Sequence, residues 1–281
     1  MRIDYLSSNE TEPDIRLSDA MLYAALRQEL GEMLELFDER RAHDGSNPLW
    51  GRDRYRILRC RIEAVAATYA EPAVMAALGD ARIVAGHRVQ GEMDRLSGMG
   101  RGAILRNMRD PAGRLRYTQA GDRYDQHRSA IGADAYTHDI LVQPNLELEF
   151  SRRYLVVAGE IAAETPIRFC EAEPLLLLDP LNRNRQARDP WSALEAGDST
   201  WPRMQRKAAE ALLADYRLVS GSIDVGLALH LDGSRSAHVE AVTACRPGDS
   251  DIYFADASAY ARKIAAHLAE IEPSLREHPE P

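Results

Sequence analysis

RLVSGSIDVGLALHLDGSRSAHVEAVTACRPGDSDIYFAD, residues 217–256, predicts a β-hairpin with two acidic side chains among apolar neighbours. Two apolar runs flank the sequence Asp-Gly-Ser at 232–234, and Asp-Gly between extended runs is a strong hairpin signal. The first run contains Asp224 and the second contains Glu240. Because these acids are about equally far from the turn, we expect them to lie near each other on paired strands.

Asp224 and Glu240 need partners if the strands that carry them are buried. A lone buried charge costs several kcal/mol, and two adjacent carboxylates repel each other unless they share a proton or a cation. Mg²⁺ prefers oxygen ligands, so the pair predicts a magnesium site. The alternative is that Asp224 faces solvent while Glu240 pairs with an arginine.

The composition is that of a globular protein, for which a reducing cytoplasm is the simplest setting. A chain of 281 residues can bury a large core, and its net charge of −9 argues against broad binding to nucleic acid or anionic membranes. No apolar run approaches the about 20 residues of a membrane helix. The start of the chain does not have the pattern of a signal peptide. The three cysteines are scattered, without metal-ligand spacing.

The rest of the chain predicts short strands interspersed with helices, and an antiparallel sheet in its middle. Strands are expected at 1–6, 81–85, 103–105, 114–118, 140–142, 154–157 and 160–167, and helices at 17–36, 54–69, 72–78, 87–96, 202–216 and 257–271.

Residues 97–102, Ser-Gly-Met-Gly-Arg-Gly, form a glycine-rich loop before the strand that ends at Arg106. Glycines let backbone N–H groups approach an anion, so such a loop can close over phosphates. The spacing matches neither the P-loop nor the Rossmann pattern. The alternative is a flexible surface hairpin.

Arg152 and Arg153 precede an apolar strand, so one of the two should face the interior. A buried arginine needs an anion. That anion is either a ligand or a neighbouring acid, Glu147 or Glu149.

Three segments resemble the ATP-grasp superfamily, most closely its small bacterial and phage-associated members. Residues 139–161 resemble the strand that lines the adenine and the acid–arginine–strand–glycine pattern after it. Residues 203–229 resemble the helix–strand unit with the first metal-binding acid, and 238–256 resemble the last strand with its Glu-x-Asn motif. The resemblance covers roughly residues 100–270.

The chain departs from the family pattern in two respects. Val242 stands where the motif has Asn, and Thr243 is the nearest oxygen-bearing residue. The family holds the phosphates with lysines, but the lysines here are Lys207 and Lys263 alone. Arg106 and Arg114 stand at the comparable positions, and Arg binds phosphate as a planar fork rather than as a point charge.

The resemblance implies an α/β (α+β) fold in which two lobes enclose ATP. It implies an N-terminal α/β region at 1–97 and an ATP-grasp-like domain at 98–272, and the terminal residues 273–281 are expected to form a disordered tail. Mg²⁺ would bind Asp224 and Glu240, and Arg153 would stabilise the transferred phosphoryl group. The expected nucleotide contacts are Arg106, Arg114 and Arg153, with the backbone of Leu141, Val142 and Gln143 at the adenine.

The implied activity is that of an ATP-dependent carboxylate–amine ligase, acting through an acyl phosphate on a small-molecule or peptide carboxylate. A degenerate fold that binds a nucleotide or partner without catalysis is the alternative, favoured by Val242 and the absent lysines. An acid-pair hydrolase built on Asp224 and Glu240 is a third hypothesis, which no second feature supports. The sequence leaves a homodimer open.

Overall fold

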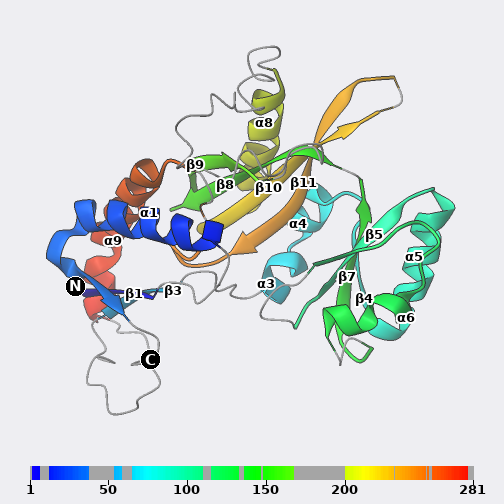
Figure 1. Ribbon diagram of the computed structural model, residues 1–281, viewed down its shortest axis with the longest axis horizontal. Coiled ribbons are helices and arrows are strands. Elements are labelled where there is room, and N and C mark those ends of the chain that lie inside the picture. Colours follow the sequence, from blue (N-terminus) through cyan, green and yellow to red (C-terminus); the bar gives the residue numbers. More distant parts are fainter. Residues whose placement is uncertain are drawn as a thin grey trace.

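The computed structural model describes residues 2–6, 13–37, 54–58, 65–109, 115–132, 136–146, 148–167, 200–230, 232–250, 252 and 255–277. These residues form a mixed α/β architecture with three sheets (Figure 1). We name them the N-terminal sheet (order β2-β1-β3), the lateral sheet (order β4-β7-β5-β6) and the central sheet (order β11-β10-β8-β9).

The N-terminal sheet is parallel and packs against two long helices. Its strands are β1 (Arg2–Leu6), β2 (Leu34–Phe37) and β3 (Arg54–Leu58). Helices α1 (Pro13–Leu30) and α9 (Ala257–Glu277) lie side by side next to it (Figure 1). One buried cluster joins these elements to Leu155 and Val157 of the central sheet. The two ends of the chain are therefore packed on one end of the central sheet.

Two expected helices are wrong in part. The helix expected at 17–36 ends at Leu30, because Gly31 takes a left-handed conformation with a φ of 57° and the chain then enters β2. Of the helix expected at 54–69, the first part is the strand β3, and only α3 (Val65–Ala70) is helical. In β3, Ile57 is fully buried, in keeping with the alternation of buried and exposed positions in a strand. The sequence pattern did not distinguish this alternation from helical spacing.

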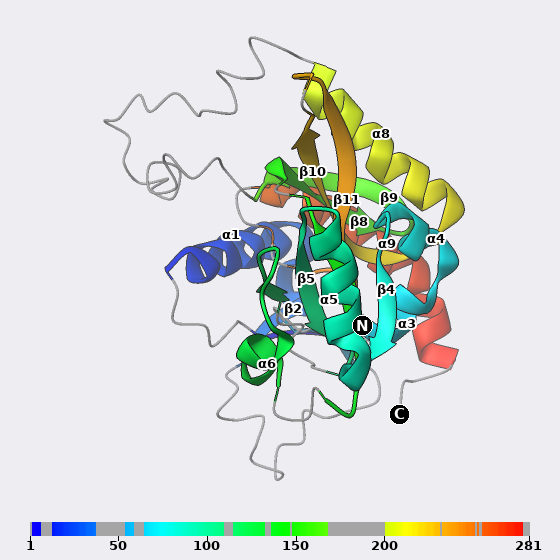
Figure 2. The same cartoon turned by 90° about the vertical axis from the view of Figure 1, so that its right-hand side faces the viewer.

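The lateral sheet consists of β4 (Arg82–Ala85), β5 (Gly102–Asn107), β6 (Leu115–Tyr117) and β7 (Asp139–Asn145), all antiparallel. Helix α5 (Val89–Gly98) covers one face of it (Figure 2). The short helix α6 (Tyr124–His127) packs beside α5. Strand β4, which precedes the boundary expected at 97/98, pairs with β7, which follows it.

The central sheet consists of β8 (Glu149–Val157), β9 (Glu160–Pro166), β10 (Ser220–Leu229) and β11 (Arg235–Ala244). Helix α8 (Thr200–Asp215) packs on one face (Figure 2). The short α4 (Pro72–Ala77), which begins with proline at its first position, lies near α8. A buried cluster with members on α3, α8, β10 and β11 fills this interface.

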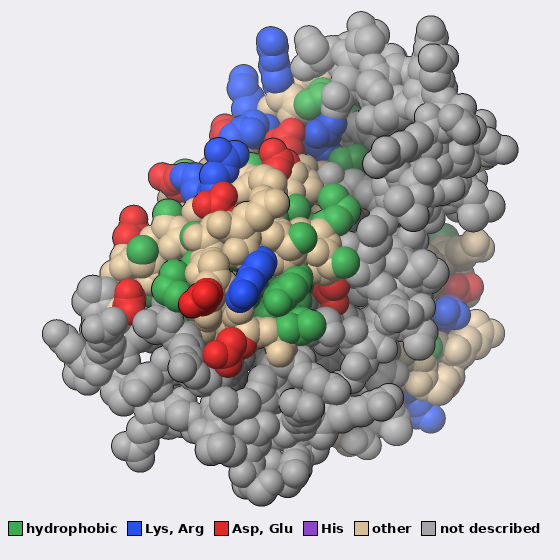
Figure 3. Space-filling model, turned by 60° about the vertical axis from the view of Figure 1, so that its left-hand side comes forward, with side chains coloured by type: hydrophobic (Ala, Val, Ile, Leu, Met, Phe, Trp, Pro, Cys, Tyr) green, Lys and Arg blue, Asp and Glu red, His purple; other side chains and the backbone are tan. Residues whose placement is uncertain are grey.

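The last described residues are helical, and the described surface carries charges of both signs. Helix α9 continues to Glu277, so the tail expected to be disordered from 273 is helical up to that residue, and 278–281 lie outside the described residues. Acidic and basic side chains are intermixed on the described part of the side shown in Figure 3. No helix among the described residues is long and apolar enough to cross a membrane.

Candidate functional site

Asp224 and Glu240 lie near each other in the β10–β11 hairpin, at a point where the pairing of the two strands is irregular. The hairpin closes through backbone hydrogen bonds between His230 and Ser234, around the expected turn. From there the two strands pair regularly as far as Val225, and then Asp224 pairs with Ala241 instead of Glu240. Glu240 is thus the extra residue of a β-bulge. Both acids are buried, at 7% and 8% exposure.

Asp224 is paired with Arg153, which stands opposite it on β8. Arg153 Nε donates to Asp224 Oδ1 and its Nη2 donates to Oδ2, each over 2.8 Å. This is the bidentate geometry that arginine forms with carboxylates. Arg153 is therefore the member of the arginine pair that faces the acids, and Asp224 does not face solvent.

Glu240 accepts hydrogen bonds from two hydroxyl groups. Ser151 Oγ on β8 donates to Glu240 Oε2 over 2.9 Å, and the Tyr117 hydroxyl on β6 donates to Oε1 over 3.3 Å. β10 runs between β8 and β11, and Gly226 leaves the space in which Ser151 and Glu240 meet. A Cβ atom at Gly226 would lie 2.9 Å from Ser151 Oγ and 2.6 Å from Leu148 Cβ. The Tyr117 contact also links the lateral sheet to the central sheet.

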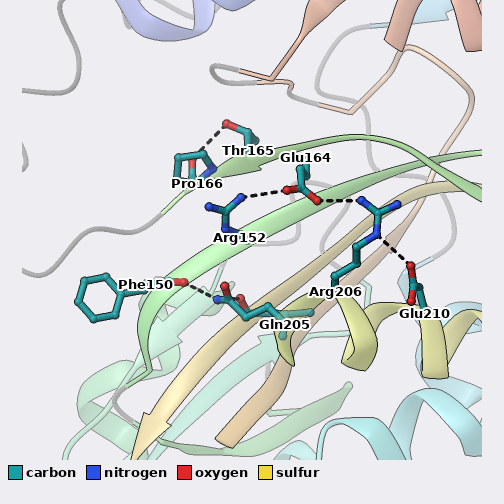
Figure 4. Close-up of polar contacts among 9 residues, drawn as sticks. Phe150, Arg152, Glu164, Thr165, Pro166, Gln205, Arg206 and Glu210 are labelled. Carbon is teal, nitrogen blue, oxygen red and sulfur yellow. Dashed lines mark hydrogen bonds and ion pairs between the residues drawn. The ribbon is translucent and has the colours of Figure 1, made fainter. Parts of the chain in front are cut away.

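Arg152 points to the other face of the central sheet, where it belongs to an ion-pair network with α8 (Figure 4). Arg152 Nη1 lies 3.1 Å from Glu164 Oε1, and Arg206 Nη1 lies 3.3 Å from Glu164 Oε2. Arg206 also pairs with Glu210 on the same helix at 2.9 Å. Of the acids expected to pair with the arginines, Glu147 and the side chain of Glu149 lie outside the described residues.

Gln205 fixes the beginning of β8 next to the acid pair. Its side-chain amide donates to the backbone carbonyls of Phe150 and Val225 from helix α8 (Figure 4). Phe150 has a φ of 47°, and the β8–β10 register shifts beside it. Ser151, the donor to Glu240, directly follows this irregular residue.

Arg106 is a buried cation on the face of the lateral sheet that is directed at the central sheet. It pairs with Leu141, which packs in the cluster shared with the central sheet, whereas its neighbour Leu105 packs under α5. Arg106 is 5% exposed and its Nε has no hydrogen-bond partner. No carboxylate among the described residues forms an ion pair with it. Its guanidinium carbon lies 4.9 Å from the centre of the Tyr69 ring.

Gln143 joins the two sheets directly, and the backbone of Leu141 and Val142 before it is paired within the lateral sheet. Gln143 Nε2 donates to the Glu240 carbonyl over 3.0 Å. Leu141 and Val142 pair with β4 on one side and with β5 on the other. Both edges of the strand are thus occupied at these two residues, and a contact of the backbone at Leu141, Val142 and Gln143 with an adenine stays a prediction.

A pocket of about 340 Å³ opens where the glycine loop, the end of β7 and the β10–β11 hairpin meet. It lies between residues of the glycine loop and residues of the β10–β11 hairpin. Its walls are formed by Gly79, Asp80, Gly100, Arg101, Gly102, Pro144, Asn145, Leu146, Ala228, Leu229, His230 and His238. β4 accompanies β7 only as far as Val142, so from Gln143 onward this strand is paired with β5 alone.

His238 brings a neutral imidazole to this pocket. Burial lowers the pKa of His238, and electrostatic interactions with His230 and Arg101 lower it further. Ser236 Oγ lies 2.8 Å from the Nε2 atom of His238 and 2.6 Å from that of His230. His238 therefore adds a polar side chain to the pocket wall.

Val242 does not point toward the acid pair. It is opposite Ile223 in the ladder, and both side chains belong to the buried cluster beneath α8. Because side chains alternate along β10, Ile223 and Asp224 occupy opposite faces. Thr243 pairs with Ser222, on the face that carries Asp224. Arg114 lies outside the described residues.

The donor set fits Mg²⁺ in chemistry, since Asp224 and Glu240 both offer carboxylate oxygens, the kind of ligand that Mg²⁺ prefers. No group of three or more acidic, histidine or cysteine side chains that could hold a metal occurs among the described residues. A bound ion would therefore depend on these two acids, on water and on ligand oxygens. It would also compete with Arg153, Ser151 and Tyr117 for the carboxylates.

The candidate site contains residues that sequence reasoning missed, namely Tyr69, Tyr117 and Ser151. Ser151 carried a usable signal, because it stands two positions before Arg153 and so shares its face of the strand. Tyr69 and Tyr117 carried none. Their partners, Val242 and Glu240, lie 173 and 123 positions away in the chain.

Comparison with known proteins identifies the fold. No protein-family model and no curated protein matches the sequence. Among solved structures, the chain matches a D-cycloserine synthetase with a TM-score of 0.51 and 14% identity, over 95% of this chain and 99% of that one. It also matches D-alanine–D-alanine ligase from Bacillus anthracis complexed with ATP, with a TM-score of 0.50 and 13% identity over 100% of both chains. A further match is the ATP-grasp ligase PsnB in complex with a precursor variant, Mg and ADP, with a TM-score of 0.46, 12% identity, and coverage of 95% and 98%.

Proposed function

From the ATP-grasp fold of this chain, we propose that it is an ATP-dependent carboxylate–amine ligase that acts through an acyl phosphate. The observation that carries the proposal is Arg106, a cation that is 5% exposed, has an unpaired Nε and faces the central sheet. A buried arginine normally has an anionic partner. A nucleotide phosphate between the two sheets supplies that partner.

The ATP would lie between the lateral and central sheets. The pocket at the glycine loop, with the backbone of Pro144, Asn145 and Leu146 on its wall, has room for the base. This replaces the contacts expected from Leu141 and Val142. The phosphates would extend along the face of the central sheet toward Arg106, Arg153 and the acids, with Arg114 a further candidate.

Asp224 and Glu240 would hold Mg²⁺, which neutralises phosphate charge when bound. Phosphoryl transfer needs charge stabilisation and positioning rather than covalent help from the protein. Arg153 is held by the bidentate contact with Asp224, so its guanidinium is fixed beside the acids. In the ligase, Arg153 would stabilise the transferred phosphoryl group. The acceptor would be a small-molecule or peptide carboxylate.

The alternative is a non-catalytic module that binds a nucleotide or a partner, and one observation favours it. Both oxygens of Asp224 accept from Arg153, and both oxygens of Glu240 accept from hydroxyl groups. The acids are thus satisfied without a metal, as in a fold that retains its shape after losing catalysis.

The experiment that tests the ligase is ADP release from ATP and Mg²⁺ with pools of amino acids and short peptides as carboxylates and amines. A carboxylate that supports release is then supplied with ¹⁸O in its carboxyl group. An acyl phosphate transfers one ¹⁸O atom to the released phosphate. ATP binding without ADP release from any pool contradicts the ligase and leaves the non-catalytic module.

A further inference from the structure

Tyr69 connects three elements of the candidate site. It belongs to the short helix α3, in the part of the chain before the segments that resemble ATP-grasp proteins. Its side chain is fully buried. Its ring faces the Arg106 guanidinium, 4.9 Å away, and its hydroxyl oxygen accepts a hydrogen bond from the Val242 N–H on β11 over 3.3 Å.

The surroundings keep the phenol neutral and its ring in place. Burial raises the pKa of Tyr69, and the positive charge of Arg106 opposes that rise without cancelling it. A cation over an aromatic face is attracted to the ring. Among the described residues no carboxylate pairs with Arg106, so the ring of Tyr69 is the group that orients this guanidinium.

We propose that Tyr69 is a positioning residue, which holds the Arg106 guanidinium toward bound nucleotide phosphate and ties it to β11, the strand that carries Glu240. This inference rests on the proposed function. An arginine side chain has many rotamers, and each must be restricted before its fork can meet a phosphate. Tyr69 restricts them before the nucleotide arrives and leaves Nε free for it.

The test is a double-mutant cycle on the affinity for ATP with Mg²⁺, measured by calorimetry on the full chain. Tyr69→Leu removes the ring and should weaken binding about tenfold. Tyr69→Phe keeps the ring and should weaken binding by less than about threefold. In an Arg106→Gln background, Tyr69→Leu should cause no further loss, because no guanidinium remains to be oriented.

Tyr124→Leu is the matched control, since Tyr124 is also a buried tyrosine but packs under α5 on the far face of the lateral sheet. It should lower thermal stability and leave ATP affinity unchanged. If Tyr69→Leu does not fold, phenylalanine and increasingly fluorinated phenylalanines at position 69 replace it. Affinity should then fall stepwise as fluorine withdraws charge from the ring, and only when Arg106 is present.

The outcomes separate this inference from the proposed function. Wild-type protein that binds no ATP overturns both. The positioning role alone is overturned if Arg106→Gln weakens ATP binding and Tyr69→Leu then weakens it by the same factor with Arg106 present and with Arg106→Gln. A loss at Tyr69→Phe as large as at Tyr69→Leu also overturns it, because the ring is then not the orienting group.

Discussion

At the scale of single residues, acids and arginines inside apolar strands were informative. Asp224, Glu240 and Arg153 were selected because a charge in a buried strand needs a partner, and each of the three has a polar or charged partner in the structure. The identity of the partners was not accessible from sequence. Asp224 contacts Arg153, 71 positions away, and Glu240 contacts Ser151, 89 positions away.

The structure changes the expected consequence of Asp224→Asn. Two repelling acids would make this substitution nearly neutral for stability, but Asp224 is the counterion of Arg153, and both side chains are mostly buried. The variant leaves that guanidinium without its anion, so we predict that unfolding becomes about 3 kcal/mol easier. Chemical denaturation measures this. Arg153→Gln in the same chain should recover part of the loss, and a neutral effect of Asp224→Asn would contradict the pairing.

Arg106→Ala should weaken ATP binding at least about tenfold, since a charge-assisted hydrogen bond contributes about 1.5–3 kcal/mol. Arg109 and Arg116 provide the controls. Arg109 is exposed, and Arg116 pairs with Leu105 on the α5 face and donates to His127 over 2.9 Å. Alanine at either position should change affinity by less than about threefold. Equal losses at all three positions would indicate diffuse charge rather than a contact.

At the scale of elements, the hairpin was predictable and its bulge was not. The turn at 232–234 and the equal spacing of the acids would place Asp224 opposite Glu240, but one extra residue shifts the pairing to Ala241. Such a bulge has no sequence signature here. It turns Val242 into the buried cluster and away from the acids, which the Glu-x-Asn comparison could not indicate.

Val242→Asn should therefore lower stability without improving magnesium dependence. An amide placed next to Ile223 finds no partner, which costs about 1–3 kcal/mol. Thermal unfolding and the Mg²⁺ dependence of ATP binding measure the two effects. Tighter Mg²⁺ binding in this variant would show that position 242 does reach the acids.

Gly226→Ala should disrupt the face of the central sheet that carries the acids. Its Cβ would lie 2.6 Å from Leu148 Cβ and 2.9 Å from Ser151 Oγ, and overpacking of this kind costs about 1–3 kcal/mol. Gly98→Ala is the control, because no atom lies within 4 Å of its added Cβ. It should be neutral or slightly stabilising. Equal effects of the two substitutions would contradict the role of Gly226 as the gap between Ser151 and Glu240.

At the scale of the whole molecule, the central and lateral sheets were largely predictable, whereas the N-terminal part was not. The hairpins are local in sequence, so alternation and turn residues were sufficient to indicate them. The N-terminal sheet is parallel and packs with α9 at the other end of the chain. Its register depends on contacts that are distant in sequence. Local apolar spacing alone therefore predicted a helix where β3 is a strand.

ATP with Mg²⁺ should bind between the lateral and central sheets. The most direct measurement is the thermal unfolding of the wild type and of Arg106→Ala, each with and without ATP and Mg²⁺. At about 100 times its dissociation constant, a ligand stabilises the folded state by about 2.7 kcal/mol, so the melting temperature of the wild type should rise by several degrees, and that of Arg106→Ala by clearly less. An unchanged melting temperature of the wild type at millimolar ATP and Mg²⁺ would contradict the claim.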